Sequence, residues 1–175
     1  MIASLAFAAL LQTTPPVASM PADPLAPAAS GQVQCYKPDT ARKTCHSIAE
    51  YRPVGDGTYT NTATVLVSKM PLVVLRSATP VRESNGAVCG NISADDISAS
   101  TLIVNGQEIP AEQAAPLLSM GVSALDKVIG HDICTTYSGP NSDLTATATL
   151  DGEARPDLTQ HVMWVSPADG YRVAP

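Results

Sequence analysis

The chain has 175 residues, of which 45% are hydrophobic and 15% charged, and its formal net charge is −6 at pH 7. This length suits a single domain that can bury a core without a metal ion to hold it together. Because phosphate and anionic lipid both attract a positive surface, the acidic balance argues against nucleic acid as a partner and against electrostatic docking on a membrane.

The N-terminal segment is typical of an export signal. Residues 2–11 form an uncharged apolar run that is too short to span a bilayer, and small residues follow it. We therefore predict a signal peptide over residues 1–19, with cleavage after Ser19 or as late as Ser30. Residues 20–33 are rich in Pro and Ala and predict a flexible lead-in, so the single globular domain is expected over 34–175. No membrane anchor is expected in the mature form.

Four cysteines lie beyond this leader, at positions 35, 45, 89 and 134. An even number of cysteines in an exported chain predicts disulfides, and three connectivities are possible. Cys35 and Cys45 flank a short polar loop and are expected to pair. Cys89 and Cys134 would then close the longer segment between them.

The loop between Cys35 and Cys45 carries three cations, Lys37, Arg42 and Lys43. A disulfide would fix the shape of this loop, and rigid charged loops on small scaffolds often make contacts. We treat the three residues as a weak candidate for an interaction site. The simpler interpretation is a solvated loop.

Beyond this loop the pattern is that of short strands and tight turns. Five dipeptides of the Asn-Gly or Asp-Gly type favour hairpin turns, because their residues tolerate positive φ. Residues 58–68 and 144–150 alternate between threonine and apolar side chains, which predicts strands with one wet face. Apolar runs at 72–75 and 162–165 predict core strands, and the second carries the only tryptophan.

Two helical segments interrupt the strands. Ser93 and Asp96 have the spacing of a capping box, which predicts a short helical turn. A longer amphipathic helix is expected over about 110–129, where Leu118, Val122 and Leu125 share one face. The predicted fold is therefore α+β: an antiparallel sheet built of hairpins, with this helix packed on one face and disulfides stapling the domain.

No catalytic motif or cofactor site stands out. Cys45-His46 and His131-x-x-Cys134 could bind a metal only if the thiols escaped oxidation, and no metal or cofactor is expected. The sequence around Ser123 lacks the final glycine of a nucleophile elbow. Adjacent Asp95 and Asp96 suit a helix N-terminus better than a pair of catalytic carboxylates.

These observations favour an exported, periplasmic or extracellular module that binds a protein or a cell-envelope component without catalysing a reaction. Two alternatives stay open. One is a small secreted hydrolase without a recognisable motif, which would need a pocket that holds a histidine beside a carboxylate. The other is an enzyme inhibitor that presents the Cys35–Cys45 loop. The sequence does not indicate an oligomeric state.

Overall fold

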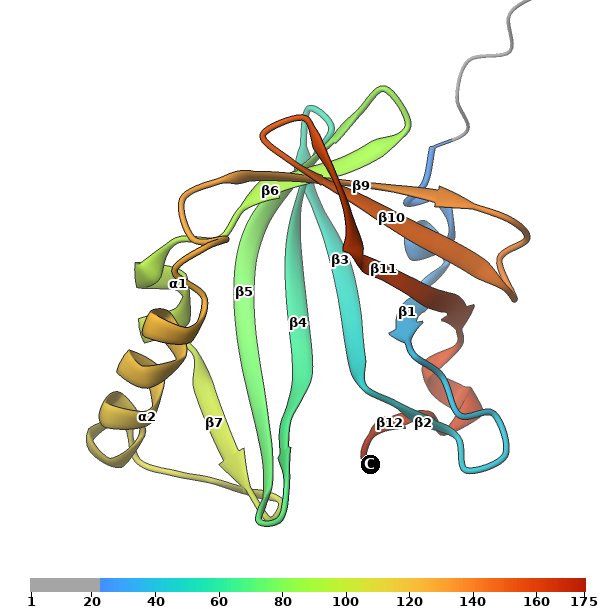
Figure 1. Cartoon of the computed structure of the whole chain (residues 1–175). Helices are drawn as coiled ribbons and strands as arrows, with labels where there is room; N and C mark the ends of the chain where they lie inside the picture. Colours follow the sequence, from blue (N-terminus) through green and yellow to red (C-terminus); the bar gives the residue numbers. More distant parts are fainter. Residues whose placement is uncertain (1–22) are drawn as a thin grey trace, which may run out of the picture.

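The computed structural model describes residues 23–175, and the predicted signal peptide lies outside this range. The described chain is dominated by antiparallel strands that wrap around a common axis (Figure 1). The elements that build the wall are β1 (Val33–Tyr36), β3 (Ser47–Gly55), β4 (Thr58–Lys69), β5 (Leu72–Ser84), β6 (Ala87–Asn91), β9 (Asp132–Ser138), β10 (Leu144–Leu150) and β11 (Glu153–Val165).

These eight strands form a closed barrel. Each strand pairs with the next along the chain, in the order β1-β3-β4-β5-β6-β9-β10-β11. The last strand then returns to the first, where Val33 pairs with Val165 and Tyr36 with Val162. The predicted α+β sheet of hairpins is therefore wrong, because the sheet curls until its two edges meet and encloses its own core.

The remaining elements are inserted or peripheral. Between β6 and β9 lie α1 (Ala94–Ser98), β7 (Thr101–Val104), β8 (Gln107–Glu108) and α2 (Ala111–Ala124). β7 pairs with the first part of β5, and β6 pairs with its last part. β2 (Thr44–Cys45) pairs with β12 (Arg172–Val173), and two 3₁₀ turns cover Ala26–Ser30 and Pro167–Asp169.

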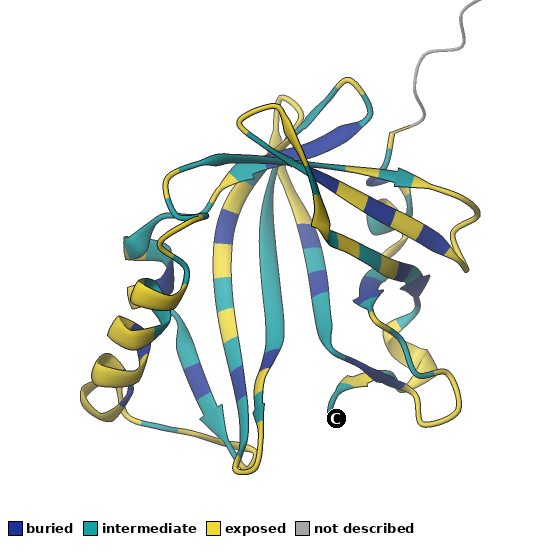
Figure 2. Cartoon of the chain, in the orientation of Figure 1, coloured by how far each residue is buried: buried dark blue, intermediate teal, exposed yellow. Residues whose placement is uncertain are grey.

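The amphipathic helix does not cover a sheet face as predicted. α2 ends at Ala124, and only Ala114 and Leu118 are buried along its length. They pack against Leu102 of β7, beside the barrel rather than over it. Figure 2 shows most of the helix surface exposed. The apolar stripe that suggested a cover for a whole sheet meets only the short extension that β7 adds to β5.

Local signals in the sequence correspond well to local structure. At four of the Asn-Gly and Asp-Gly pairs both residues have positive φ, as in the Asp56-Gly57 turn between β3 and β4. The fifth, Asp169-Gly170, ends a 3₁₀ turn instead. The predicted capping box at Ser93 is confirmed, with the Asp96 amide donating to the Ser93 hydroxyl at 3.0 Å.

The core occupies the barrel interior. Along β10, Leu144, Ala146 and Ala148 are buried while Thr145 and Thr147 are exposed, as the alternation predicted. Figure 2 shows this banding along the strand. Trp164 and Leu25 belong to the same buried cluster. Leu25, only 1% exposed, lies within the segment predicted as a lead-in, so this part of the segment packs on the barrel near the start of β1.

Both predicted cysteine pairs are present as disulfides. Cys35 joins β1 to Cys45 of β2, and Cys89 joins β6 to Cys134 of β9. The second pair links two residues that face each other in the β6–β9 ladder, at the base of the inserted helices. Two disulfides indicate an oxidising, non-cytoplasmic location.

Candidate functional site

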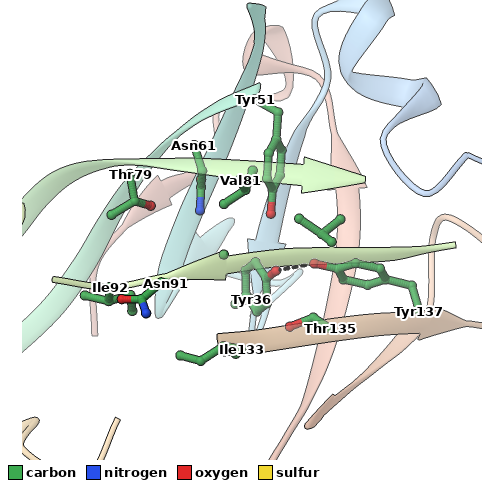
Figure 3. Close-up of a pocket in the computed structure, with 12 residues that line it drawn as sticks. Tyr36, Tyr51, Asn61, Thr79, Val81, Asn91, Ile92, Ile133, Thr135 and Tyr137 are labelled. Carbon is green, nitrogen blue, oxygen red and sulfur yellow. Dashed lines mark hydrogen bonds between the residues drawn. The ribbon is translucent and has the colours of Figure 1, made fainter. Parts of the chain in front are cut away.

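A cavity of about 140 Å³ lies inside the barrel. Eight-stranded barrels are at the size where the interior is either filled by side chains or holds one small ligand. Figure 3 shows that the residues lining this cavity come from strands on opposite sides of the space. They are Tyr36, Tyr51, Asn61, Thr79, Val81, Val88, Gly90, Asn91, Ile92, Ile133, Thr135 and Tyr137.

The strand register explains why these residues meet. Asn61 of β4 pairs with Tyr51 of β3 on one side and with Thr79 of β5 on the other. Directly paired residues in a sheet point to the same face, so all three side chains turn inward together. Gly90 of β6 lies opposite Val81 of β5, and a Cβ added to Gly90 would come within 2.8 Å of Val81 Cγ1. Because Gly90 has no side chain, Val81 can pack directly against the backbone of β6 at this wall of the cavity.

Three tyrosine hydroxyls gather around one buried amide. Gln34 is fully buried, and its Oε1 accepts hydrogen bonds from Tyr36 at 2.8 Å, Tyr51 at 2.9 Å and Tyr137 at 3.2 Å. The Tyr36 and Tyr137 hydroxyls also lie 2.9 Å apart, and Figure 3 shows the two side chains pointing toward each other. We call these four residues the tyrosine cluster.

Two buried polar atoms near this cluster have no hydrogen-bond partner within residues 23–175: Gln34 Nε2 and Asn61 Oδ1. Buried polar groups are nearly always hydrogen-bonded, because an unmet group loses its contacts to water without compensation. Asn61 lines the cavity, and in Figure 3 its side chain turns toward this space with the amide nitrogen at its tip. A polar ligand could therefore satisfy this amide.

The cavity is electrically neutral. No Asp, Glu, Lys, Arg or His lines it. Burial is the largest cause that raises the pKa of Tyr36 and of Tyr51 well above the ordinary value of 10.0. Tyr137 adds to the rise at both residues, whereas the hydrogen bond with Tyr36 acts in the opposite direction on the pKa of Tyr51. Both phenols therefore stay protonated at physiological pH.

This pKa shift predicts how stability depends on alkaline pH. The raised pKa values mean that the folded state holds two protons that the unfolded state releases near pH 10.0. The stabilisation is fully present below that pH and is lost as the pH rises toward the folded values. Ultraviolet titration of tyrosinate should show Tyr36 and Tyr51 ionising last, together with unfolding. Early ionisation of all five tyrosines without unfolding would contradict the shift.

The histidine and carboxylate pairs lie outside the cavity. His131 Nδ1 is 2.6 Å from Asp151, and His161 Nε2 is 2.5 Å from Asp143, with the side chains about half exposed or more. The hydrolase alternative needed such a pair inside a pocket, and neither pair lines this one. Cys45 and Cys134 are oxidised and cannot ligate a metal as thiolates. Within residues 23–175 no group of three metal-binding side chains occurs.

The cations predicted as a weak interaction site lie on the loop outside the barrel. Arg42 binds Asp39 of the same loop at 2.8 Å, and Lys43 donates to the main-chain oxygen of Asp169 at 2.9 Å. The main-chain amide of Lys37 donates to His161. The interaction site itself stays a prediction. The cavity residues were missed because tyrosines scattered over three strands carry no common motif.

Comparisons with known proteins give no relative: no family model, curated protein or solved structure matches the chain. Among the described residues, no helix has the length and apolar character needed to cross a bilayer. The geometry of the barrel interior is therefore the main guide to function.

Proposed function

We propose that this chain is an exported, non-enzymatic binding protein of the periplasm or the extracellular space, and that it holds one small uncharged molecule inside its barrel. The observation that carries the proposal is the neutral cavity beside the tyrosine cluster, with an Asn61 amide oxygen left without a partner. A side-chain-filled barrel would leave neither the space nor the unmet polar atom. The cavity favours a small molecule over the macromolecular partner that the sequence suggested.

The lining limits the charge and the size of the ligand. A charged group would lose its hydration here without meeting an opposite charge, which is a large energetic penalty. Apolar cavities of about 150 Å³ hold benzene. A space of about 140 Å³ therefore suits a compact molecule of similar size. Access is available where Asn91, an exposed residue at the end of β6, reaches the lining.

The fluorescence of Trp164 provides a direct test. This residue is the only tryptophan, and its ring centre lies 6.2 Å from that of Tyr51, which lines the cavity. Titration of the mature protein with phenol or toluene should change this fluorescence saturably. Benzoate, which has a similar ring and a negative charge, should not bind.

A matched pair of variants locates the binding. Thr135→Phe should fill the cavity and abolish binding, because Thr135 lines it. Thr136→Phe places the same side chain on the outer face, where Thr136 contacts Thr147, and should leave binding unchanged. Thermal unfolding of both variants checks that they fold. If neither phenol nor toluene binds the unaltered protein, or if Thr135→Phe binds as well as Thr136→Phe, the proposal fails.

A further inference from the structure

We infer that the ligand of this cavity is a neutral, compact ring bearing a hydroxyl group, which the tyrosine cluster and Asn61 recognise from two sides. The inference rests on the proposed function and adds the chemical class of the ligand. It follows from counting the donors and acceptors that the cavity wall leaves unused.

The hydrogens of the tyrosine cluster are used within the cluster. A phenol has one hydrogen to donate, and an amide oxygen accepts two hydrogen bonds comfortably. Tyr36 and Tyr51 lie nearest to Gln34 Oε1, at 2.8 and 2.9 Å. Tyr137 is 3.2 Å from the same oxygen and 2.9 Å from the Tyr36 hydroxyl, so its hydrogen also has a partner.

The hydrogen-bonding capacity that the tyrosine cluster leaves unused consists of oxygen lone pairs. The hydroxyls of Tyr51 and Tyr137 donate but receive no hydrogen bond in this arrangement, and both side chains line the cavity. The tyrosine side of the cavity therefore offers acceptors, and a ligand must bring a donor to it. An ether or a hydrocarbon has none.

Asn61 offers a further acceptor to the ligand from the opposite strands, together with an amide donor. Its amide turns toward the same space from β4, and its Oδ1 has no partner within the described chain. A carboxamide presents both a donor and an acceptor, and a hydroxyl group can pair with either of them. One ligand hydroxyl can thus donate its single hydrogen either to Asn61 Oδ1 or to a tyrosine oxygen, and in the second case its own oxygen can accept from the Asn61 amide nitrogen.

The rest of the wall fits the body of a ring. Val81, Val88 and Ile133 supply apolar surface around the polar groups. Combining apolar walls with a few placed polar groups is the usual construction of a small-molecule site. The available volume, about 140 Å³, limits the ligand to roughly one ring with a short substituent.

Probes that differ only in the donor test the inference. Phenol should bind the mature protein at least about 10-fold more tightly than anisole, in which a methyl group replaces the donor hydrogen, or toluene. Cyclohexanol should behave like phenol if the hydroxyl, rather than the aromatic ring, is recognised. Affinities come from Trp164 fluorescence and are confirmed by calorimetry.

Variants identify the recognising groups. Tyr51→Phe and Asn61→Leu should each reduce the preference for phenol over toluene by about 10-fold, while toluene binding persists. The control is Tyr171→Phe, since Tyr171 packs beside the Cys35–Cys45 disulfide and does not line the cavity. Equal affinity for phenol, anisole and toluene would overturn the inference and leave the proposed function standing. Absence of binding by every probe would overturn both.

Discussion

Replacing Gln34 by leucine should lower the free energy of unfolding by about 2 kcal/mol, although leucine is apolar and similar in size. The expected loss comes from the hydroxyls rather than from Gln34 itself. Tyr51 would lose its acceptor altogether, and Tyr36 would lose the nearer of its two partners. A buried hydroxyl left unpaired costs about 1–3 kcal/mol, and removal of the unpartnered Gln34 Nε2 offsets part of this.

Denaturation by urea, followed through Trp164, measures this change. The matched control is Gln107→Leu, which makes the same exchange at an exposed position on β8 and should alter stability by less than about 0.5 kcal/mol. Adding Tyr51→Phe to Gln34→Leu should recover part of the loss, because the unpaired hydroxyl is then gone. Unchanged or increased stability in Gln34→Leu would show that the tyrosine cluster does not depend on this amide.

The sequence predicts those features of the barrel that depend on interactions between residues close together in the chain. Turn residues such as Asp56-Gly57 and the capping pair Ser93 and Asp96 act within a few positions, so their patterns predict the local conformation correctly. Strand alternation likewise predicts which residues of β10 are buried. An alternating strand has one buried face whether the sheet is open or closed, so alternation does not distinguish the two architectures.

Barrel closure depends on contacts that the periodicity cannot reveal. β1 and β11 lie near opposite ends of the described chain, and their pairing alone joins the two edges of the sheet. Without that contact the same hairpins would form an open sheet, whose apolar face would need another element packed on it. The amphipathic helix α2 is the element that the sequence offers for this role. The helix exists, but closure leaves it only the flank of β5 and β7 to pack against.

One strand shows how a local irregularity changes the pattern. The alternation over residues 58–68 predicts that Val67 shares a face with Tyr59, Ala63 and Val65. A register shift between Leu66 and Ser68 moves Val67 outward, where it is 61% exposed, and Leu66 is buried instead. A bulge inserts one unpaired residue and reverses the alternation beyond it. The amino-acid composition of the strand does not indicate where the bulge lies.

The candidate site was the least predictable feature. Gln34, Tyr51 and Tyr137 are separated along the sequence, and each looks like an ordinary strand residue. They converge because β1, β3 and β9 place inward positions at the same depth in the barrel. The only hint in the sequence is at Gln34, where a polar side chain stands between the apolar residues Val33 and Cys35.

Removal of the Cys89–Cys134 disulfide should produce the largest loss of stability of any change considered. With a sequence separation of 45, this crosslink should contribute about 4 kcal/mol by restricting the unfolded chain. Cys35 and Cys45 are only 10 residues apart, and the same relation gives about 3 kcal/mol. We therefore expect Cys89→Ala/Cys134→Ala to unfold at lower urea concentration than Cys35→Ala/Cys45→Ala.

The two double variants serve as controls for each other, because each makes the same chemical change, the replacement of one disulfide by two alanines. If the crosslink acts on the unfolded state, its removal also increases the slope of stability against urea, since the freed chain exposes more surface. This increase should be greater for Cys89→Ala/Cys134→Ala. If that variant instead loses less than about 1 kcal/mol with an unchanged slope, the β6–β9 ladder holds the inserted helices without help from sulfur. The Cys89–Cys134 disulfide would then reflect an oxidising location without being required by the fold.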